Sequence, residues 1–293
     1  MKQIVVISGK GGTGKTILTA SFAALAKNKM MVDCDVDAAD LHLLLHPVVK
    51  ERHEFKSGKT AKLNKKICTQ CGKCITLCRF GAIKYDLTSD PISCEGCGLC
   101  SLICPAKAIT MEENVAGEWF ISDTKYGPFV HAKLGIAEEN SGKLVAKIRQ
   151  VAKEIAENDH LDYVIVDGPP GIGCPVIASL SGVDCAVVVT EPTLSGLHDA
   201  KRVIEVCAHF KVPVKMVINK YDLNIDMTKK IEAYCRSGNI EIAGKILFDG
   251  SIPKTLVKGI TAIEGASEEV VKEIKDIWGE VINYDNYKAE AAG

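Results

Sequence analysis

A glycine-rich loop near the N-terminus constrains this chain more than any other feature. Residues 9–16 read GKGGTGKT, follow the apolar run IVVI at residues 4–7, and precede a helix-like segment at residues 17–26. A strand, such a loop and a helix in this order form a phosphate site. Glycines let the backbone turn N–H groups toward one anion, and the helix N-terminus adds partial positive charge. The alternative, an ordinary glycine-rich turn, is disfavoured because strand, loop, lysine and helix are all in register. The loop therefore predicts a nucleotide site.

Two residues at the end of the loop have specific expected roles. We expect Lys15 to contact the β- and γ-phosphates of ATP and Thr16 to place its hydroxyl on Mg²⁺. The other nucleotide-binding candidates are the loop residues before them: Gly9, Lys10, Gly11, Gly12, Thr13 and Gly14.

Lys10 is a second lysine, at the start of a loop that needs only one. The loop resembles the deviant Walker A signature K-G-G-x-G-K-T of MinD/ParA/Mrp-type ATPases. The resemblance implies a doubly wound, mostly parallel α/β ATPase that forms a homodimer, or a heterodimer with a paralogue, when ATP binds. In that family the signature lysine reaches the partner's ATP, so the resemblance assigns Lys10 to catalysis together with Lys15 and Asp35. A solvated lysine is the alternative reading of Lys10.

Aspartates end two further expected strands. Residues 30–35 read as a strand that carries Asp33 and Asp35, and residues 162–167 read as another that ends in Asp167 before Gly-Pro-Pro-Gly. Carboxylates at the carboxyl edge of a parallel sheet, beside a phosphate loop, suit Mg²⁺ and water. By resemblance, Asp33 and Asp167 would hold Mg²⁺ with Thr16, and Asp35 would lie in switch I near the attacking water.

The resemblance also implies residues for the base. An expected strand at residues 214–219 ends in Asn219, where the family has an asparagine that hydrogen-bonds the adenine edge. Pro253, in a segment at residues 248–253, would pack against the ring.

Eight of the thirteen cysteines lie in two runs of equal spacing, offset by 26 residues (Cys68 to Cys94). Each run reads C-x₂-C-x₂-C-x₃-C and resembles a two-cluster bacterial ferredoxin, in which the fourth cysteine of each run ligates the other cluster. The resemblance assigns two [4Fe–4S] clusters, one to Cys68, Cys71, Cys74 and Cys104, the other to Cys94, Cys97, Cys100 and Cys78. Zinc is disfavoured because zinc sites use four ligands in two pairs. Arg79 replaces the proline that usually follows the fourth cysteine.

These features predict a ferredoxin-like α+β domain at residues 61–112, inserted after the second strand of an ATPase domain formed by residues 1–60 and 113–293. Residues 50–66 carry seven basic side chains and read as a solvated linker or a hairpin with its turn at Ser57-Gly58. A docking patch for an acidic redox partner is the alternative. Strand-like fragments at residues 118–122 and 129–134 should lead back to the main sheet.

The five cysteines outside the runs are less informative. Cys174 follows Asp167 by seven residues, where the nitrogenase iron protein has a cysteine that ligates a cluster between two subunits. The second ligand of that cluster has no counterpart between Pro105 and Asp162, so a buried structural cysteine is the other reading. Strand and helix patterns place the remaining four in the core: Cys34, Cys185, Cys207 and Cys235.

Composition excludes several classes of partner. The net charge is −1, so no global basic field points to nucleic acid or anionic lipid. The sequence has no apolar run of transmembrane length, and its first apolar run is a strand rather than a signal peptide. The last expected helix, residues 268–282, places its apolar residues on one face for core packing, and the tail from residue 283 is not basic, so no membrane anchor is expected. We expect a cytoplasmic protein.

The predicted function is a dimeric ATP-binding and ATP-hydrolysing switch, slow without its partner, coupled to iron–sulfur electron transfer to or from another protein. Two alternatives remain open. One is a MinD/ParA-like spatial organiser of cell division or partition, which would need a membrane or DNA surface. The other is an Mrp-like factor for iron–sulfur or metallocofactor maturation, for which only Cys174 is a candidate for a bridging cluster.

Overall fold

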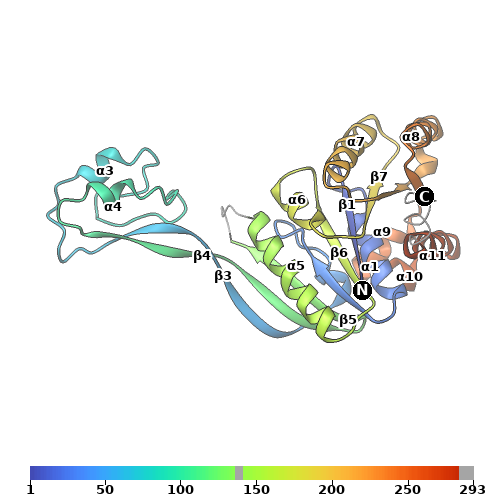
Figure 1. Ribbon diagram of the computed structural model, residues 1–293, viewed down its shortest axis with the longest axis horizontal. Coiled ribbons are helices and arrows are strands. Elements are labelled where there is room, and N and C mark those ends of the chain that lie inside the picture. The colour runs from blue at the N-terminus through green and yellow to red at the C-terminus, as the bar shows by residue number, and fades with distance from the viewer. Residues whose placement is uncertain (136–140, 284–293) are drawn as a thin grey trace. The chain divides into compact units, whose positions relative to one another are not determined.

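The computed structural model describes residues 1–135 and 141–283, and the prediction for the C-terminal tail lies almost wholly outside them (Figure 1). The described strands are β1 Lys2–Ser8, β2 Lys29–Asp33, β3 Val48–Leu63, β4 Ile109–Thr124, β5 Gly127–Leu134, β6 Tyr163–Pro170, β7 Cys185–Thr190, β8 Val214–Asn219 and β9 Glu241–Ile246. The described helices are α1 Lys15–Leu25, α2 His42–Leu45, α3 Lys73–Leu77, α4 Leu99–Ile103, α5 Ser141–Asn158, α6 Cys174–Leu180, α7 Leu194–His209, the 3₁₀ turn η1 Tyr221–Leu223, α8 Ile225–Ser237, α9 Ser251–Lys258, α10 Ala262–Gly265 and α11 Glu268–Ile282. Among these helices, none combines the length and the hydropathy needed to cross a membrane.

The strands form a nine-stranded sheet in the order β3-β4-β5-β2-β6-β1-β7-β8-β9. The pairs from β5 to β9 are parallel, and β1 lies between β6 and β7, with Val5 opposite Val166 on one side and Ala186 on the other. A central parallel strand is covered on both faces, which explains why β1 is an unbroken apolar run. The predicted mostly parallel α/β fold is confirmed.

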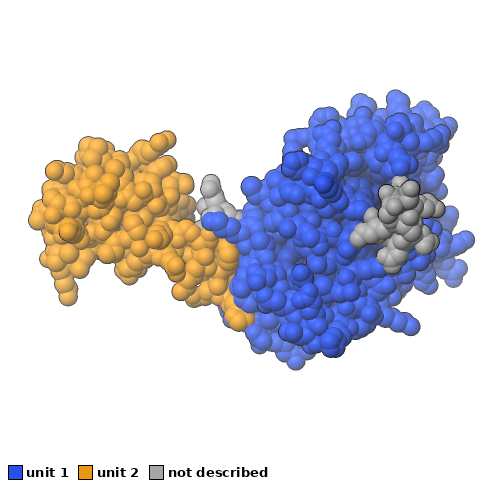
Figure 2. Space-filling model, in the orientation of Figure 1, with its two compact units in different colours: residues 1–52, 119–133, 141–293 blue, residues 53–118, 134–140 orange. Residues whose placement is uncertain are grey.

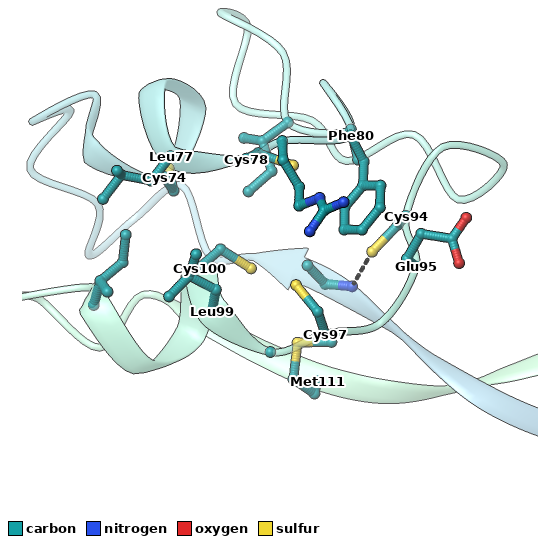
Figure 3. Close-up of a pocket in the computed structure, with 16 residues that line it drawn as sticks. Cys74, Leu77, Cys78, Phe80, Cys94, Glu95, Cys97, Leu99, Cys100 and Met111 are labelled. Atoms are coloured by element: carbon teal, nitrogen blue, oxygen red, sulfur yellow. Dashed lines mark hydrogen bonds between the residues drawn. The ribbon is translucent and has the colours of Figure 1, made fainter.

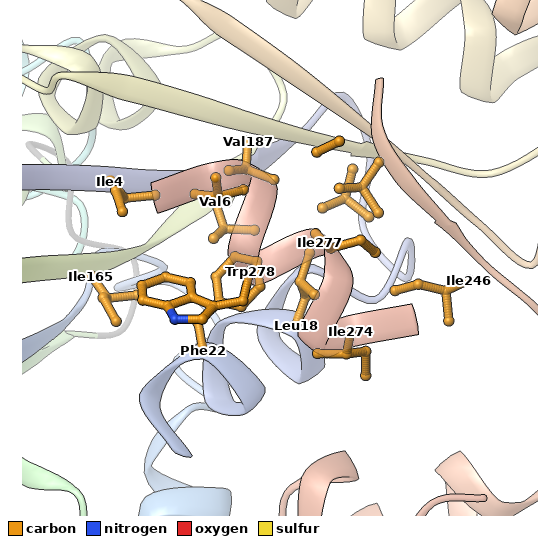
Figure 4. Packing of buried hydrophobic residues seen from close by; sticks show 14 of the residues in the cluster. Ile4, Val6, Leu18, Phe22, Ile165, Val187, Ile246, Ile274, Ile277 and Trp278 are labelled. Atoms are coloured by element: carbon orange, nitrogen blue, oxygen red, sulfur yellow. The ribbon is translucent and has the colours of Figure 1, made fainter. Parts of the chain in front are cut away.

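One face of the sheet packs against α1 and α11 (Figure 4). Ile4 and Val6 of β1 belong to this apolar cluster, and the rings of Phe22 and Trp278 lie 5.0 Å apart between their centroids. The predicted helix at residues 268–282 therefore packs in the core, as expected. Side chains alternate along a strand, so Val5 points to the other face, which α5, α6 and α7 cover.

The chain divides into two compact units (Figure 2). The first comprises residues 1–52, 119–133 and the described residues from 141 onward, and the second consists mainly of residues 53–118. The second unit contains α3 and α4 and a small apolar cluster around Ala61, Ile83 and Ile109. Both long strands, β3 and β4, have residues in each unit, so the chain leaves the first unit along β3 and returns along β4.

The hairpin predicted within residues 50–66 is wrong, because β3 continues as one strand through Ser57-Gly58. Gly58 has φ of +77°, the conformation that suggested a turn, but β3 pairs with β4, a distant segment that a local pattern cannot reveal. Two of the basic side chains in this segment form ion pairs with β4. Lys50 lies 2.8 Å from Asp123, and Lys62 lies 2.9 Å from Glu112.

Candidate functional site

The glycine-rich loop joins β1 to α1, as the sequence predicts. Gly12 and Gly14 have φ of +77° and +93°, and Gly14 is the N-cap of α1. A Cβ at Gly14 would lie 2.4 Å from Nδ2 of Asn219, so this position excludes any side chain. The loop thus brings backbone N–H groups to the N-terminus of a helix, which is the geometry that binds phosphate.

Lys15 is buried and forms an ion pair with Asp35, with 2.7 Å between Nζ and Oδ2. Burial lowers the pKa of Lys15, but the charges of Asp167 and Asp35 outweigh it, so its pKa lies above the ordinary value. The structure therefore brings together the lysine expected on the phosphates and the aspartate expected near the attacking water.

Asp167 lies within β6, which continues to Pro170 rather than ending at Asp167 as predicted. It accepts hydrogen bonds from the hydroxyls of Thr16 at 2.7 Å and Thr19 at 2.8 Å. Asp33 is fully buried and accepts backbone N–H bonds from Asp35 at 3.0 Å and Leu41 at 3.2 Å. Sequence reasoning missed Thr19, although it lies three residues after Thr16 and therefore shares its face of α1.

The carboxyl groups of Asp33 and Asp167 have raised pKa values, because burial disfavours their charge and each repels nearby carboxylates. A bound divalent cation would relieve both effects. Among the described residues, no group of three or more His, Cys, Asp or Glu is placed to hold a metal ion. Mg²⁺ does not need such a group, because it binds through one or two carboxylates, water and substrate phosphates. Asp33, Asp167 and Thr16 supply oxygen donors of the right chemistry.

Lys10 is held by residues that follow β7. Its Nζ lies 2.6 Å from Oε1 of Glu191 and donates to Ser195 Oγ at 3.1 Å and Thr193 Oγ1 at 3.4 Å. Glu191 is also 3.5 Å from Nζ of Lys220. Burial raises the pKa of Glu191, but the bond to Lys10 outweighs it, so the pKa lies below its ordinary value. Lys10 is therefore bound by neighbouring side chains, which the alternative of a solvated lysine did not predict. No sequence motif indicated Glu191 as its partner.

Asn219 is buried at the end of β8, where its Nδ2 donates to the backbone oxygen of Thr13 at 2.8 Å. Its Oδ1 is buried without a hydrogen-bond partner among the described residues. An unpaired buried acceptor is costly and suits an amino group such as that of adenine. Pro253 lies exposed in the first turn of α9.

In the second unit, each predicted set of four cysteines lines one cavity. A cavity of about 270 Å³ has Cys94, Cys97, Cys100 and Cys78 among its lining residues, together with Cys74, Arg79 and Phe80 (Figure 3). A smaller cavity of about 20 Å³ is lined by the other set: Cys68, Cys71, Cys74 and Cys104.

Backbone donors lie beside several of the cysteine sulfurs, while burial raises the pKa of Cys74 and Cys100. Backbone N–H groups donate to three sulfurs: Ala61 to Cys94 at 3.5 Å, Gln70 to Cys68 at 3.4 Å and Ala108 to Cys104 at 3.3 Å. Such bonds are one means by which proteins tune cluster potentials. All thirteen cysteines are free, and the eight in the two runs are at least partly exposed. Two sets of four thiols are the donors that two [4Fe–4S] clusters take, although no three of these thiols are placed to hold one metal ion.

The cysteines outside the runs divide as follows. Cys174 is exposed and is the first residue of α6, so the reading of Cys174 as a buried structural residue is wrong. The core reading of the others is confirmed, since all four are buried: Cys34, Cys185, Cys207 and Cys235.

Known proteins that resemble this chain include two relatives in sequence and one solved structure. The uncharacterized protein MJ0578 of Methanocaldococcus jannaschii is 34% identical over 286 residues, which cover 94% of this chain and 95% of that protein. The pyruvate synthase subunit PorD of Methanothermobacter marburgensis is 37% identical over 77 residues, 24% of this chain and 95% of PorD. The septum site-determining protein MinD of Pyrococcus horikoshii OT3, complexed with Mg-ADP, has the same fold. Its TM-score is 0.58 at 17% identity, with coverage of 96% of this chain and 95% of that one.

The CobQ/CobB/MinD/ParA nucleotide binding domain matches residues 4–262, nearly the whole span from β1 to α10. With the loop geometry and the buried carboxylates described above, this match shows that the chain belongs to the CobQ/CobB/MinD/ParA nucleotide-binding family.

Proposed function

We propose that this chain is an ATP-hydrolysing dimeric switch that gates electron transfer between two [4Fe–4S] clusters and a protein partner. The observation that carries the proposal is the coincidence of cavities and cysteines. Each of two cavities is lined by one complete four-cysteine set, in a chain whose other unit has a phosphate loop. The similarity to PorD, a subunit of pyruvate synthase, supports a redox role.

In the proposed organisation, residues 61–112 are a ferredoxin-like insertion between two parts of an ATPase domain. The compact units support an insertion of this kind, although their division falls at residues 53 and 118 rather than at 61 and 112. The clusters would supply one-electron carriers of low potential, and the eight cysteines would be their ligands.

At the nucleotide site, the proposed roles follow from position. Lys15 leaves Asp35 to bind the phosphates, and Thr16 with Asp33 and Asp167 holds Mg²⁺. Asp35, once free of Lys15, orients the attacking water. Asn219 Oδ1 accepts from the adenine amino group. The Mg-ADP in the MinD structure of similar fold supports a magnesium nucleotide at this place.

Hydrolysis should be slow in a single subunit, because Lys10 forms an ion pair with Glu191 of the same subunit. No lysine besides Lys15 then stabilises the negative charge of the transition state. A second subunit, either another copy or a paralogue, would supply Lys10 in trans. Lys10→Ala should bind ATP but not hydrolyse it, Lys15→Ala should lose productive phosphate contact, and Asp35→Ala should trap an ATP-bound dimer.

The test is an anaerobic measurement on the cluster-containing protein. Iron content should be about eight per chain. The reduction potential, the rate of iron chelation or the affinity for a partner should differ between the apo form and the ATP-trapped Asp35→Ala form. A colourless, folded, zinc-loaded protein would remove the electron-transfer function. Identical cluster properties in both states would favour the MinD/ParA-like organiser, which the family match also supports.

A further inference from the structure

A short segment after α9 is bonded to residues just before β3 and just after β4. This connecting segment comprises residues 259–264, from the C-cap of α9 into α10 (Figure 1). It follows residues 248–253, the expected base-side segment. Phe248 in that segment donates its backbone N–H to Asp222, three residues after Asn219, at 2.6 Å, which links the start of α9 to the expected base site.

On the outgoing side, the connecting segment holds the residues before β3. Nε2 of His46, two residues before β3, donates to the carbonyl of Gly259 at 2.6 Å. Gly259 has φ of +64°, and a Cβ there would lie 2.9 Å from the His46 ring. A glycine at this position allows both the turn and the close approach of the imidazole.

On the returning side, Glu264 holds the turn between β4 and β5. Its carboxylate is 2.5 Å from Nζ of Lys125 and accepts from the hydroxyl of Tyr126 at 2.8 Å. The same carboxylate caps α10, accepting from the backbone N–H and the hydroxyl of Thr261 at 2.9 and 3.0 Å. Burial raises the pKa of Glu264, but these donors outweigh it and hold the pKa at about 2, so the side chain stays charged.

These bonds make the connecting segment a shared anchor. Glu264 belongs to a capping box that fixes α10, so a movement of α9 or α10 displaces the acceptors of Lys125 and His46 together. β3 and β4 then receive the same displacement at their ends in the first unit. A single exposed ion pair would not pass a movement from one segment to another. Here the carboxylate of Glu264 accepts from four donors in two segments, one at residues 125–126 and the other at Thr261.

We propose that Glu264 is a positioning residue that transmits the nucleotide state from α9 and α10 to β4 through Lys125 and Tyr126, with His46 doing the same for β3. The inference rests on the proposed function for its biological meaning, but the transmission itself is measurable without the clusters' activity. Coupled sites usually change each other's equilibria by about fivefold or more.

The experiment is hydrogen exchange on the full, cluster-containing chain under anaerobic conditions, without nucleotide, with Mg-ADP and with ATP in the Asp35→Ala background. Two variants cut the connection from opposite sides. Glu264→Gln removes the charge but keeps an oxygen for Thr261. Lys125→Met leaves the capping box of α10 intact, so it still tests the connection if Glu264→Gln unfolds that helix. The matched control is Glu232→Gln, which removes a 2.9 Å ion pair with Lys245 in the same unit, away from β3 and β4.

In the parent protein, nucleotide should change the exchange rates of β4 amides, which we express as the ratio of the rates without and with nucleotide. In both variants this ratio should fall to about one, while the affinity for nucleotide stays within about twofold of the parent value. Glu232→Gln should keep the parent ratio. A parent-like ratio in both Glu264→Gln and Lys125→Met, or no nucleotide effect on β4 in the parent, would overturn the inference. The iron-chelation rate, measured alongside, separates the two claims. If β4 responds to nucleotide but chelation does not, the proposed function fails and the positioning role stands.

Discussion

Replacing Glu191 with glutamine should make the protein dimerise more tightly on ATP. In the structure Lys10 is 2.6 Å from Glu191, with 29% and 19% of the two side chains exposed. If Lys10 acts on the partner's nucleotide, this contact must break in each subunit before the dimer forms. Glu191 thus competes with the dimer for the same lysine.

The size of the effect follows from the partial burial of this ion pair. Exposed pairs contribute about 0.2–1 kcal/mol and hydrogen bonds to charged groups about 1.5–3 kcal/mol, so we take about 1 kcal/mol for Lys10 on Glu191. Two lysines are released per dimer, which gives about 2 kcal/mol. At about 1.4 kcal/mol per tenfold, the dimer dissociation constant should fall roughly 30-fold.

The assay is sedimentation equilibrium with a non-hydrolysable ATP analogue, together with the rate of ATP hydrolysis. Lys220→Gln is the control, because it removes the other cation near Glu191, at 3.5 Å, and leaves Lys10 in place. The gain from Glu191→Gln should vanish in a Lys10→Ala background. If Glu191→Gln leaves the dimer dissociation constant unchanged, or lowers it equally in the Lys10→Ala background, Glu191 does not compete with the dimer for Lys10.

Three further predictions address the loop, the clusters and the buried carboxylates. Gly14→Ala should weaken nucleotide binding by about tenfold in calorimetry, since a side chain at φ +93° costs about 1–2 kcal/mol and its Cβ would meet Asn219. Cys97→Ser should lose about four of eight irons in an anaerobic iron assay while Cys174→Ser keeps all of them, and full iron in Cys97→Ser would contradict the ligand assignment. The raised pKa of Asp33 means that the folded state binds this proton more tightly than the unfolded state, so its contribution to the free energy of unfolding falls as pH rises from about 3.8 through the raised value. In urea unfolding across this pH range, the free energy of unfolding should fall less steeply with pH in Asp33→Asn than in the unmodified protein. Equal slopes in the two proteins would be evidence that the Asp33 carboxyl has its ordinary pKa.

Features encoded over short stretches were predictable from sequence. The strand at residues 214–219 and the helix at residues 268–282 have the expected bounds, because each carries a complete local pattern of apolar residues. The phosphate loop was predictable for the same reason, since its glycines, Lys15 and Thr16 act within eight consecutive residues.

Contacts between distant segments were decided only by the tertiary structure. Ser57-Gly58 reads locally as a turn, yet the pairing of β3 with β4 keeps it in one strand. Glu191 and Glu264 carry no motif, and their roles arise because the sheet brings Lys10 to one and Lys125 to the other. The sequence by itself determined where a glycine-rich loop lies between a strand and a helix, and which thiols fall into two sets. Only the folded chain decided which carboxylate holds each lysine, because that depends on strand order, which a local pattern does not contain.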